Sequence, residues 1–111
     1  MTKEQLRNYQ AIKKEKSQIE RRLRSLEKRP EEEQEVLKPI RDLYREKLEA
    51  LVALQVRIEQ AIDSLGPVER ELFRYRYIDC LEWHQVAAKI HYSWQQTHRI
   101  HSAALVKLKD K

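Results

Sequence analysis

The chain has 111 residues, enough for one ordinary domain or for a long helical element that carries one small module. Charged residues make up 37% and aromatic residues 7%, and the chain holds one Gly and three Pro, so its composition favours helices and excludes all-β folds. A net charge of +5 favours a polyanionic partner. One cysteine excludes an internal disulfide, and the absence of a secretory signal or a long apolar run predicts a cytoplasmic protein without a membrane partner.

The first half of the chain has the apolar periodicity of two amphipathic helices. Apolar residues recur at three- and four-residue intervals from Lys3 to about Lys28, which predicts one helix there. A second, more apolar stripe predicts a longer helix through Leu37, Ile40, Tyr44, Leu48, Leu51, Leu54 or Gln55, Ile58, Ile62 and Leu65. Together they predict an antiparallel coiled-coil hairpin over residues 1–64. Lys16 falls at a core position, which predicts marginal packing in that layer.

The connection between these helices contains two prolines. Pro30 suits a first helical position, and Glu31 to Glu33 suit the positive end of a helix dipole. Pro39 either kinks a helix that begins at Pro30 or itself begins the second long helix, and we favour the latter. The hairpin is interpreted either as a homodimerisation or partner-docking arm or as a solvated spacer.

Leu65-Gly66-Pro67 interrupts the helical pattern with the only glycine of the chain. Gly followed by Pro is a good helix stop and restart, so a domain boundary is predicted here, with a second module over residues 65–111. Three helices are expected in it, over 67–78, 83–90 and 94–108. Its expected core residues are Leu72, Phe73, Tyr77, Trp83, Val86, Ala87, Ile90, Ile100, Ala104, Leu105 and Leu108.

The last two of these helices are joined by the tight turn His91-Tyr92-Ser93, in which Ser93 is a good N-cap. This arrangement predicts a helix-turn-helix that binds double-stranded DNA with its second helix in the major groove. No acidic residue lies between Ser93 and Lys109, so nothing on this helix repels phosphate. The predicted base-reading residues are Trp94, Gln95, His98 and Arg99. The predicted contacts to the DNA backbone are Ser93, Gln96, Ser102, Arg70, Arg74, Arg76, Lys107 and Lys109.

A family resemblance covers residues 65–108. It is carried by Leu65, Pro67, Glu69, Leu72, Arg74, Arg76, Tyr77, Trp83, Val86, Ala87, Ser93, Arg99, Ile100, Ala104, Leu105 and Leu108. These residues resemble region four of bacterial sigma factors and, more closely, small sigma-like phage proteins related to ArpU-type late-gene regulators. The resemblance implies promoter or operator binding by a phage- or prophage-encoded transcription regulator, with RNA polymerase as a further partner. Glu82 and Thr97 depart from the pattern, at a cap and at a usually aliphatic core position.

Other chemistry finds little support in the sequence. His98 and His101 with Cys80 or His84 lack the paired Cys or clustered His that zinc needs, so we expect no metal and no cofactor. Cys80 beside His84 lacks an orienting carboxylate and an oxyanion donor, so we expect no enzyme and interpret Cys80 as an apolar helix-end residue. A protein-interaction module, either a coiled-coil adaptor or a polymerase-binding protein, and a phage DNA-packaging recognition subunit remain alternative functions.

Overall fold

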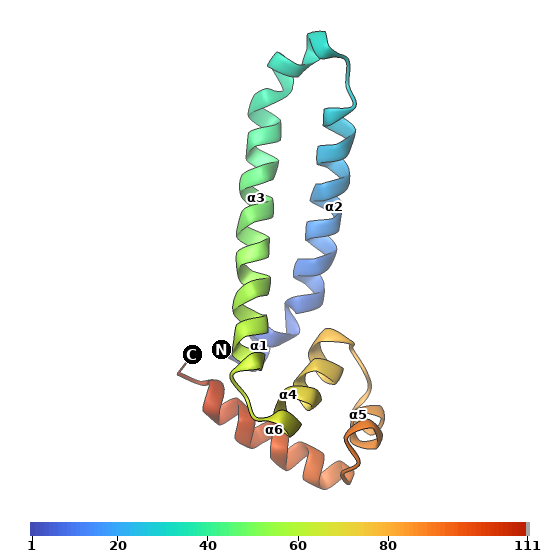
Figure 1. Cartoon of the computed structure of the whole chain (residues 1–111), viewed down its shortest axis with the longest axis vertical. Helices are drawn as coiled ribbons and strands as arrows, with labels where there is room; N and C mark the ends of the chain where they lie inside the picture. Colours follow the sequence, from blue (N-terminus) through green and yellow to red (C-terminus); the bar gives the residue numbers. More distant parts are fainter. Residues whose placement is uncertain (111) are drawn as a thin grey trace. The chain divides into compact units, whose positions relative to one another are not determined.

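The computed structural model describes residues 1–110, and every regular element in that range is a helix (Figure 1). In chain order the elements are α1 (Lys3–Arg7), α2 (Tyr9–Glu27), α3 (Glu31–Asp63), α4 (Pro67–Phe73), the π-helix η1 (Arg74–Ile78), α5 (Trp83–Ile90) and α6 (Trp94–Leu108). The predicted all-α class, with a helical hairpin followed by a helix-turn-helix, is confirmed. None of the helices within residues 1–110 has the length and apolar character needed to span a bilayer.

The described residues form two compact units. One comprises residues 11–56, and the other combines Met1–Gln10 with the residues from Arg57 onward. The predicted boundary at Leu65 coincides with the break between α3 and α4, but it does not separate these compact units. The reason is burial: Leu6 of α1 and Ile62 of α3 are both fully buried, so both helices contribute to the core of the second unit.

In the first unit, α2 and α3 run antiparallel as a hairpin (Figure 1). Ile19 and Leu23 of α2 and Leu51 of α3 are buried, as the helical period predicts. At the position where Leu54 and Gln55 were alternatives, Gln55 is half-buried and Leu54 is exposed. The buried stripe of α3 therefore continues through an amide rather than a leucine, which keeps this layer of the hairpin polar.

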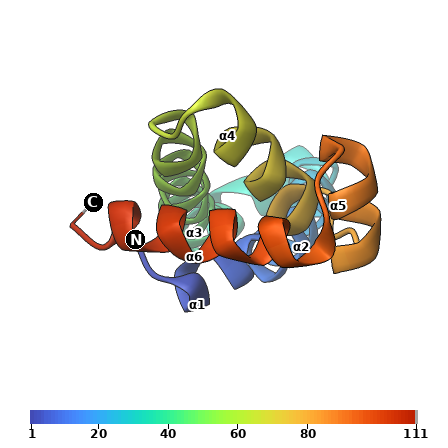
Figure 2. The same cartoon turned by 90° about the horizontal axis from the view of Figure 1, so that it is seen from below.

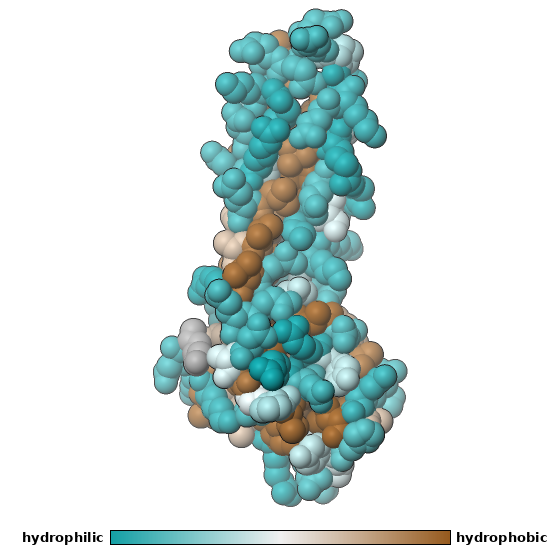
Figure 3. Space-filling view, viewed as in Figure 1, coloured by the Kyte–Doolittle hydropathy of each residue, from teal (hydrophilic) through white to brown (hydrophobic). Residues whose placement is uncertain are grey.

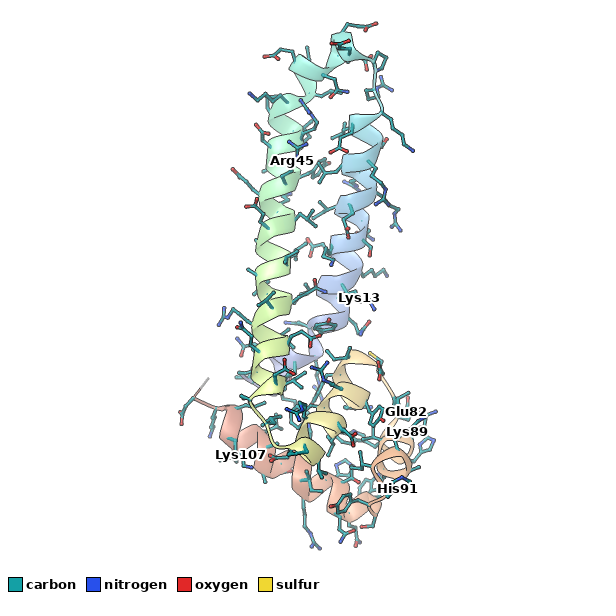
Figure 4. All side chains as sticks on the ribbon, viewed as in Figure 1. Lys13, Arg45, Glu82, Lys89, His91 and Lys107 are labelled. Atoms are coloured by element: carbon teal, nitrogen blue, oxygen red, sulfur yellow. The ribbon has the colours of Figure 1, made fainter. Side chains whose placement is uncertain are left out.

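The loop of the hairpin is held by side chains. Gln34 Nε2 donates to the carbonyls of Leu26, at 3.1 Å, and Arg29, at 2.8 Å, and so ties the first turn of α3 to the end of α2 and the loop. Arg45 Nη2 lies 3.3 Å from Glu27 Oε1 and joins the two helices near the loop (Figure 4). Because both of these charged side chains are about half exposed, the ion pair adds little stability.

Two expectations about the first half are wrong. The predicted helix from Lys3 to Lys28 is interrupted at Asn8, whose amide bonds back to the carbonyls of Glu4 and Gln5 and ends α1. The second long helix begins at Glu31 rather than at Pro39, which lies inside α3. Pro39 supplies no amide donor for the Glu35 carbonyl, and Arg41 Nη2 donates to the neighbouring Gln34 carbonyl at 3.1 Å.

The second unit has a core to which α1, the end of α3, α4, α5 and α6 contribute fully buried side chains, and Tyr9 of α2 and Tyr77 of η1 are also buried. Its largest fully buried residues are Leu6, Ile62, Leu72, Phe73, Val86, Thr97 and Leu108. α4 packs against both α5 and α6, and Figure 2 shows α6 crossing beneath α4. The Met1 ammonium donates to the Leu108 carbonyl at 2.7 Å, so the first residue contacts the end of the last helix.

Candidate nucleic-acid interface

The helix-turn-helix consists of α5, a three-residue turn and α6. Val86, Ala87 and Ile90 of α5 are buried, as predicted. His91 adopts a left-handed conformation at φ 62°, and the amide of Tyr92 reaches back to the Ala87 carbonyl at 3.2 Å. These hydrogen bonds satisfy carbonyls at the end of α5 in the manner of a left-handed helix cap, although a histidine occupies a position where glycine is more common. The turn therefore has a defined backbone geometry that fixes where α6 begins.

α6 begins with a complete capping box. Ser93 Oγ accepts from the Gln96 amide at 3.1 Å, and Gln96 Oε1 accepts from the Ser93 amide at 3.2 Å, so the predicted Ser93 cap is confirmed. Thr97, at the usually aliphatic position, is fully buried, and its hydroxyl donates to the Ser93 carbonyl at 2.7 Å. That bond explains how a polar residue is accepted there without an unpaired buried hydroxyl. Ser93 and Gln96 thus hold the helix start, and both remain exposed.

The outer side of α6 is exposed and free of carboxylates. Trp94 is 57% exposed, which is high for an aromatic residue without a partner molecule, and Gln95 and Arg99 are exposed on the same turns. Ser102 is also exposed. Three of the four predicted base-reading side chains are therefore available to a ligand that lies along the first turns of α6.

His98, the fourth predicted base-reading residue, has a different position. Its ring is half-buried between two tryptophans, with centroids 4.3 Å from Trp83 and 4.1 Å from Trp94. Its Nε2 atom is buried and has no hydrogen-bond partner among the described residues. The structure therefore makes His98 a packing residue that supports the exposed indole of Trp94, rather than a side chain presented to bases.

His101 and Tyr77 form a buried polar pair beneath α6. Tyr77 Oη lies 2.6 Å from His101 Nε2, and Phe73 packs against both rings. Burial raises the pKa of Tyr77 to about 12 and lowers the pKa of His101 to about 4. Both groups are thus neutral at pH 7, and the His101 tautomer sets which of them donates in this hydrogen bond. His101 is nearly fully buried, at 4% exposure, whereas Ile100 and Leu105, both expected in the core, are only half-buried.

Three of the predicted contacts to the DNA backbone already interact with groups of the protein itself: Arg74, Arg76 and Lys107. Arg74 pairs with Glu59, at 3.2 Å, and with Asp63, at 2.5 Å, and the hydrogen bond to Asp63 raises its pKa. Arg76 lies 4.7 Å over the Trp83 ring and donates to the Leu81 carbonyl at 2.9 Å.

Lys107 Nζ contacts Glu69 Oε1 at 2.8 Å (Figure 4). Arg70 is half-exposed and Lys109 is exposed, and neither forms an ion pair within residues 1–110. Of the predicted cationic contacts, these two are the ones whose charge is not already matched by a neighbouring carboxylate or held against a ring.

Two residues before α5 also differ from expectation. Cys80 is exposed with φ 57°, so it ends η1 in a left-handed turn and is not an apolar residue packed at a helix end. Glu82, which departs from the family pattern at a cap, precedes α5, and its amide donates to Gln85 Oε1 at 2.9 Å as one half of a capping box. Across residues 1–110, no group of three or more His, Cys, Asp or Glu side chains is placed to hold a metal ion.

Two cations of α1 were not among the predicted site residues. Lys3 and Arg7 belong to the same compact unit as the helix-turn-helix, although they precede it by more than 70 residues in the chain. Arg76 and Trp83 lie with them along one cavity. No sequence signal could have placed these cations beside the motif, because the contact depends on how α1 packs.

Comparison with known protein families, curated proteins and solved structures finds no match to this chain.

Proposed function

We propose that the protein is a sequence-specific DNA-binding transcription regulator that reads the major groove with the first turns of α6. The observation that carries the proposal is the exposed, carboxylate-free outer side of α6, where Trp94, Gln95 and Arg99 follow a rigid cap. A B-DNA major groove admits one α-helix. Gln pairs bidentately with adenine, Arg pairs with guanine, and an indole packs on a thymine methyl or on the sugar edge.

The remaining contacts in this proposal are to phosphates. Ser102, Arg70 and Lys109 are the predicted backbone contacts that are accessible and free of internal ion pairs among the described residues. The exposed amide of Gln96 and hydroxyl of Ser93 lie at the start of α6, where the free backbone N–H groups of a helix also favour an anion. Affinity then comes from the cations, and specificity from the side chains that reach base edges.

The proposal is tested by selecting bound sequences from a random duplex pool with the full chain. Enrichment of a defined site is expected. Arg99→Ala should then cost about 1–3 kcal/mol on that site and much less on random duplex, because it removes a bidentate base contact. The matched control is Arg21→Ala, an exposed arginine on α2 that removes the same charge. Absence of enrichment, or equal losses on both duplexes for Arg99→Ala, would contradict base reading.

A second candidate function is assembly through α3, and one observation favours it. Val36, Leu43 and Leu54 are apolar yet 81%, 44% and 42% exposed, and they recur along α3 at intervals of seven and eleven residues with the exposed Ala50 between them. Figure 3 shows apolar side chains along the hairpin surface. Such spacing keeps residues on one helix face, as in a coiled-coil seam between two copies.

Sedimentation of the full chain over a range of concentrations tests this candidate. A dimer that Leu43→Glu disrupts and Arg45→Glu leaves intact would support it, because Arg45 lies on a different side of the same helix and changes the charge more. A monomer at every concentration would refute it. A dimer that selects no DNA site would favour the interaction module over the DNA-binding regulator.

A further inference from the structure

A cavity of about 200 Å³ opens beside the start of α5. Its walls come from segments that are distant in the chain but belong to one compact unit. The lining residues are Lys3, Arg7, Gln10, Arg76, Tyr77, Cys80 and Trp83. Three of these seven are cations and none is a carboxylate, so the cavity has the composition of an anion site.

The cations produce a positive field inside the unit. Besides the dominant effect of burial, Lys3, Arg76 and Arg7 each lower the pKa of His101, as neighbouring positive charges must. Arg76 and Arg7 likewise oppose the rise that burial causes in the pKa of Tyr77, while Glu4 reinforces it. Glu4 also pairs with Arg7 at 3.1 Å, but this ion pair is exposed and therefore weak.

Arg76 is held in place before any ligand arrives. Its guanidinium lies over the Trp83 ring and uses one N–H on the Leu81 carbonyl. A guanidinium has five N–H donors in a planar fork, so donors remain for a planar or tetrahedral oxyanion. Gln10, another lining residue, is held by the hydrogen bond from its Nε2 to the Ile78 carbonyl at 2.6 Å. Lys3 and Arg7 are exposed and can close over a bound anion.

We propose that this cavity binds a phosphate group and that, in the DNA complex, it holds a backbone phosphate next to the helix-turn-helix. The assignment of this phosphate to the DNA backbone rests on the proposed function. It is favoured because Trp83 lines the cavity and also packs against His98, which in turn supports the exposed Trp94 of α6. A phosphate in the cavity is therefore linked by two ring contacts to the predicted base-reading surface.

The first arm of the test uses Cys80 as a reporter, since it is the only cysteine and lines the cavity. Its alkylation by iodoacetamide, a neutral reagent, is followed with and without inorganic phosphate at constant ionic strength. We expect phosphate to slow alkylation severalfold in the unmodified protein and to have no effect in the double variant Lys3→Gln, Arg7→Gln. The charge-conserving variant Lys3→Arg, Arg7→Lys should restore the protection.

The second arm measures the salt dependence of binding to random duplex DNA. Losing the single phosphate held in the cavity should reduce the slope of log K against log salt by about 0.9. The matched control Lys13→Gln, Arg21→Gln removes the same two charges from exposed positions on α2 and should leave the slope unchanged. Thermal melting of each variant confirms that it folds.

The outcomes separate the claims. Unchanged alkylation together with an unchanged slope overturns the cavity as a phosphate site. Protection by inorganic phosphate with an unchanged slope overturns the DNA source and assigns the cavity to a free phosphate. If the unmodified protein binds no duplex at all, the proposed function fails, whereas protection of Cys80 by inorganic phosphate still supports the cavity.

Discussion

The hydroxyl of Tyr77 offers the most direct test of how the core beneath α6 is built. It is hydrogen-bonded to His101 Nε2 over 2.6 Å, and both residues are at most 5% exposed. Tyr77→Phe removes this hydroxyl and keeps the ring, including its packing at 5.4 Å against Phe73. The buried Nε2 of His101 is then left without its hydrogen-bond partner.

The expected cost follows from that unpaired nitrogen. Removing one partner of a buried hydrogen bond costs about 1–3 kcal/mol, because the other group keeps its desolvation penalty. The vacated space is the size of one oxygen atom, so loss of packing adds little. The free energy of unfolding should therefore fall by about 1–3 kcal/mol at pH 7.

Urea unfolding followed by tryptophan fluorescence measures this change, since Trp83 and Trp94 both lie in the unit that contains Tyr77. The midpoint should move to lower urea with an unchanged dependence on denaturant. Tyr92→Phe is the control, because Tyr92 is 40% exposed and water can replace its hydrogen bonds. If Tyr77→Phe costs no more than this control, the buried hydroxyl does not stabilise the core and the argument is refuted.

Three further predictions concern pH, capping and charge. Burial lowers the pKa of His101 in the folded state to about 4 from 6.5, so between these pH values the folded state binds fewer protons than the unfolded state. The free energy of unfolding should therefore fall as the pH drops from about 6.5 toward 4, by up to about 1.4 kcal/mol per pH unit. Urea midpoints measured across this range should depend less on pH for His101→Gln. Ser93→Ala removes the cap of α6 and should cost about 1 kcal/mol in urea unfolding, whereas retention of full stability would show that the capping box contributes nothing. Lys109→Gln should reduce the salt slope of DNA binding by about 0.9. Arg74→Gln should leave this slope nearly unchanged, because two carboxylates already match the charge of Arg74. Equal reductions would show that Arg74 does contact phosphate.

The local features of the motif could be predicted because their causes are local. Ser93 caps α6 through a bond to an amide three residues away, and Gly66 followed by Pro67 separates α3 from α4 by backbone preference alone. The helical period likewise identified Leu51, Ile58 and Ile62 as buried residues of α3, but it missed the buried Ala61 and left the choice between Leu54 and Gln55 open.

The internal ion pairs of the predicted cationic contacts could not be predicted, because the carboxylates that pair with them come from elsewhere in the chain. Arg74 meets carboxylates of α3, and Lys107 meets Glu69, which lies 38 residues earlier. His98 has a position on α6 that suits base reading, yet its burial between two tryptophans depends on how α5 packs. Helical spacing gives the direction of a side chain, but it does not show whether another element already occupies that side.

The all-α class, the bounds of α5 and α6, and the turn between these two helices followed from the sequence alone. Apolar period, caps and helix breakers act within a few residues, so they can be read along the chain. Only the tertiary structure decided that α1 joins the unit of the helix-turn-helix, bringing Lys3 and Arg7 to Arg76 and Trp83. That placement depends on burial of Leu6 in a shared core, a long-range packing effect that no local pattern encodes.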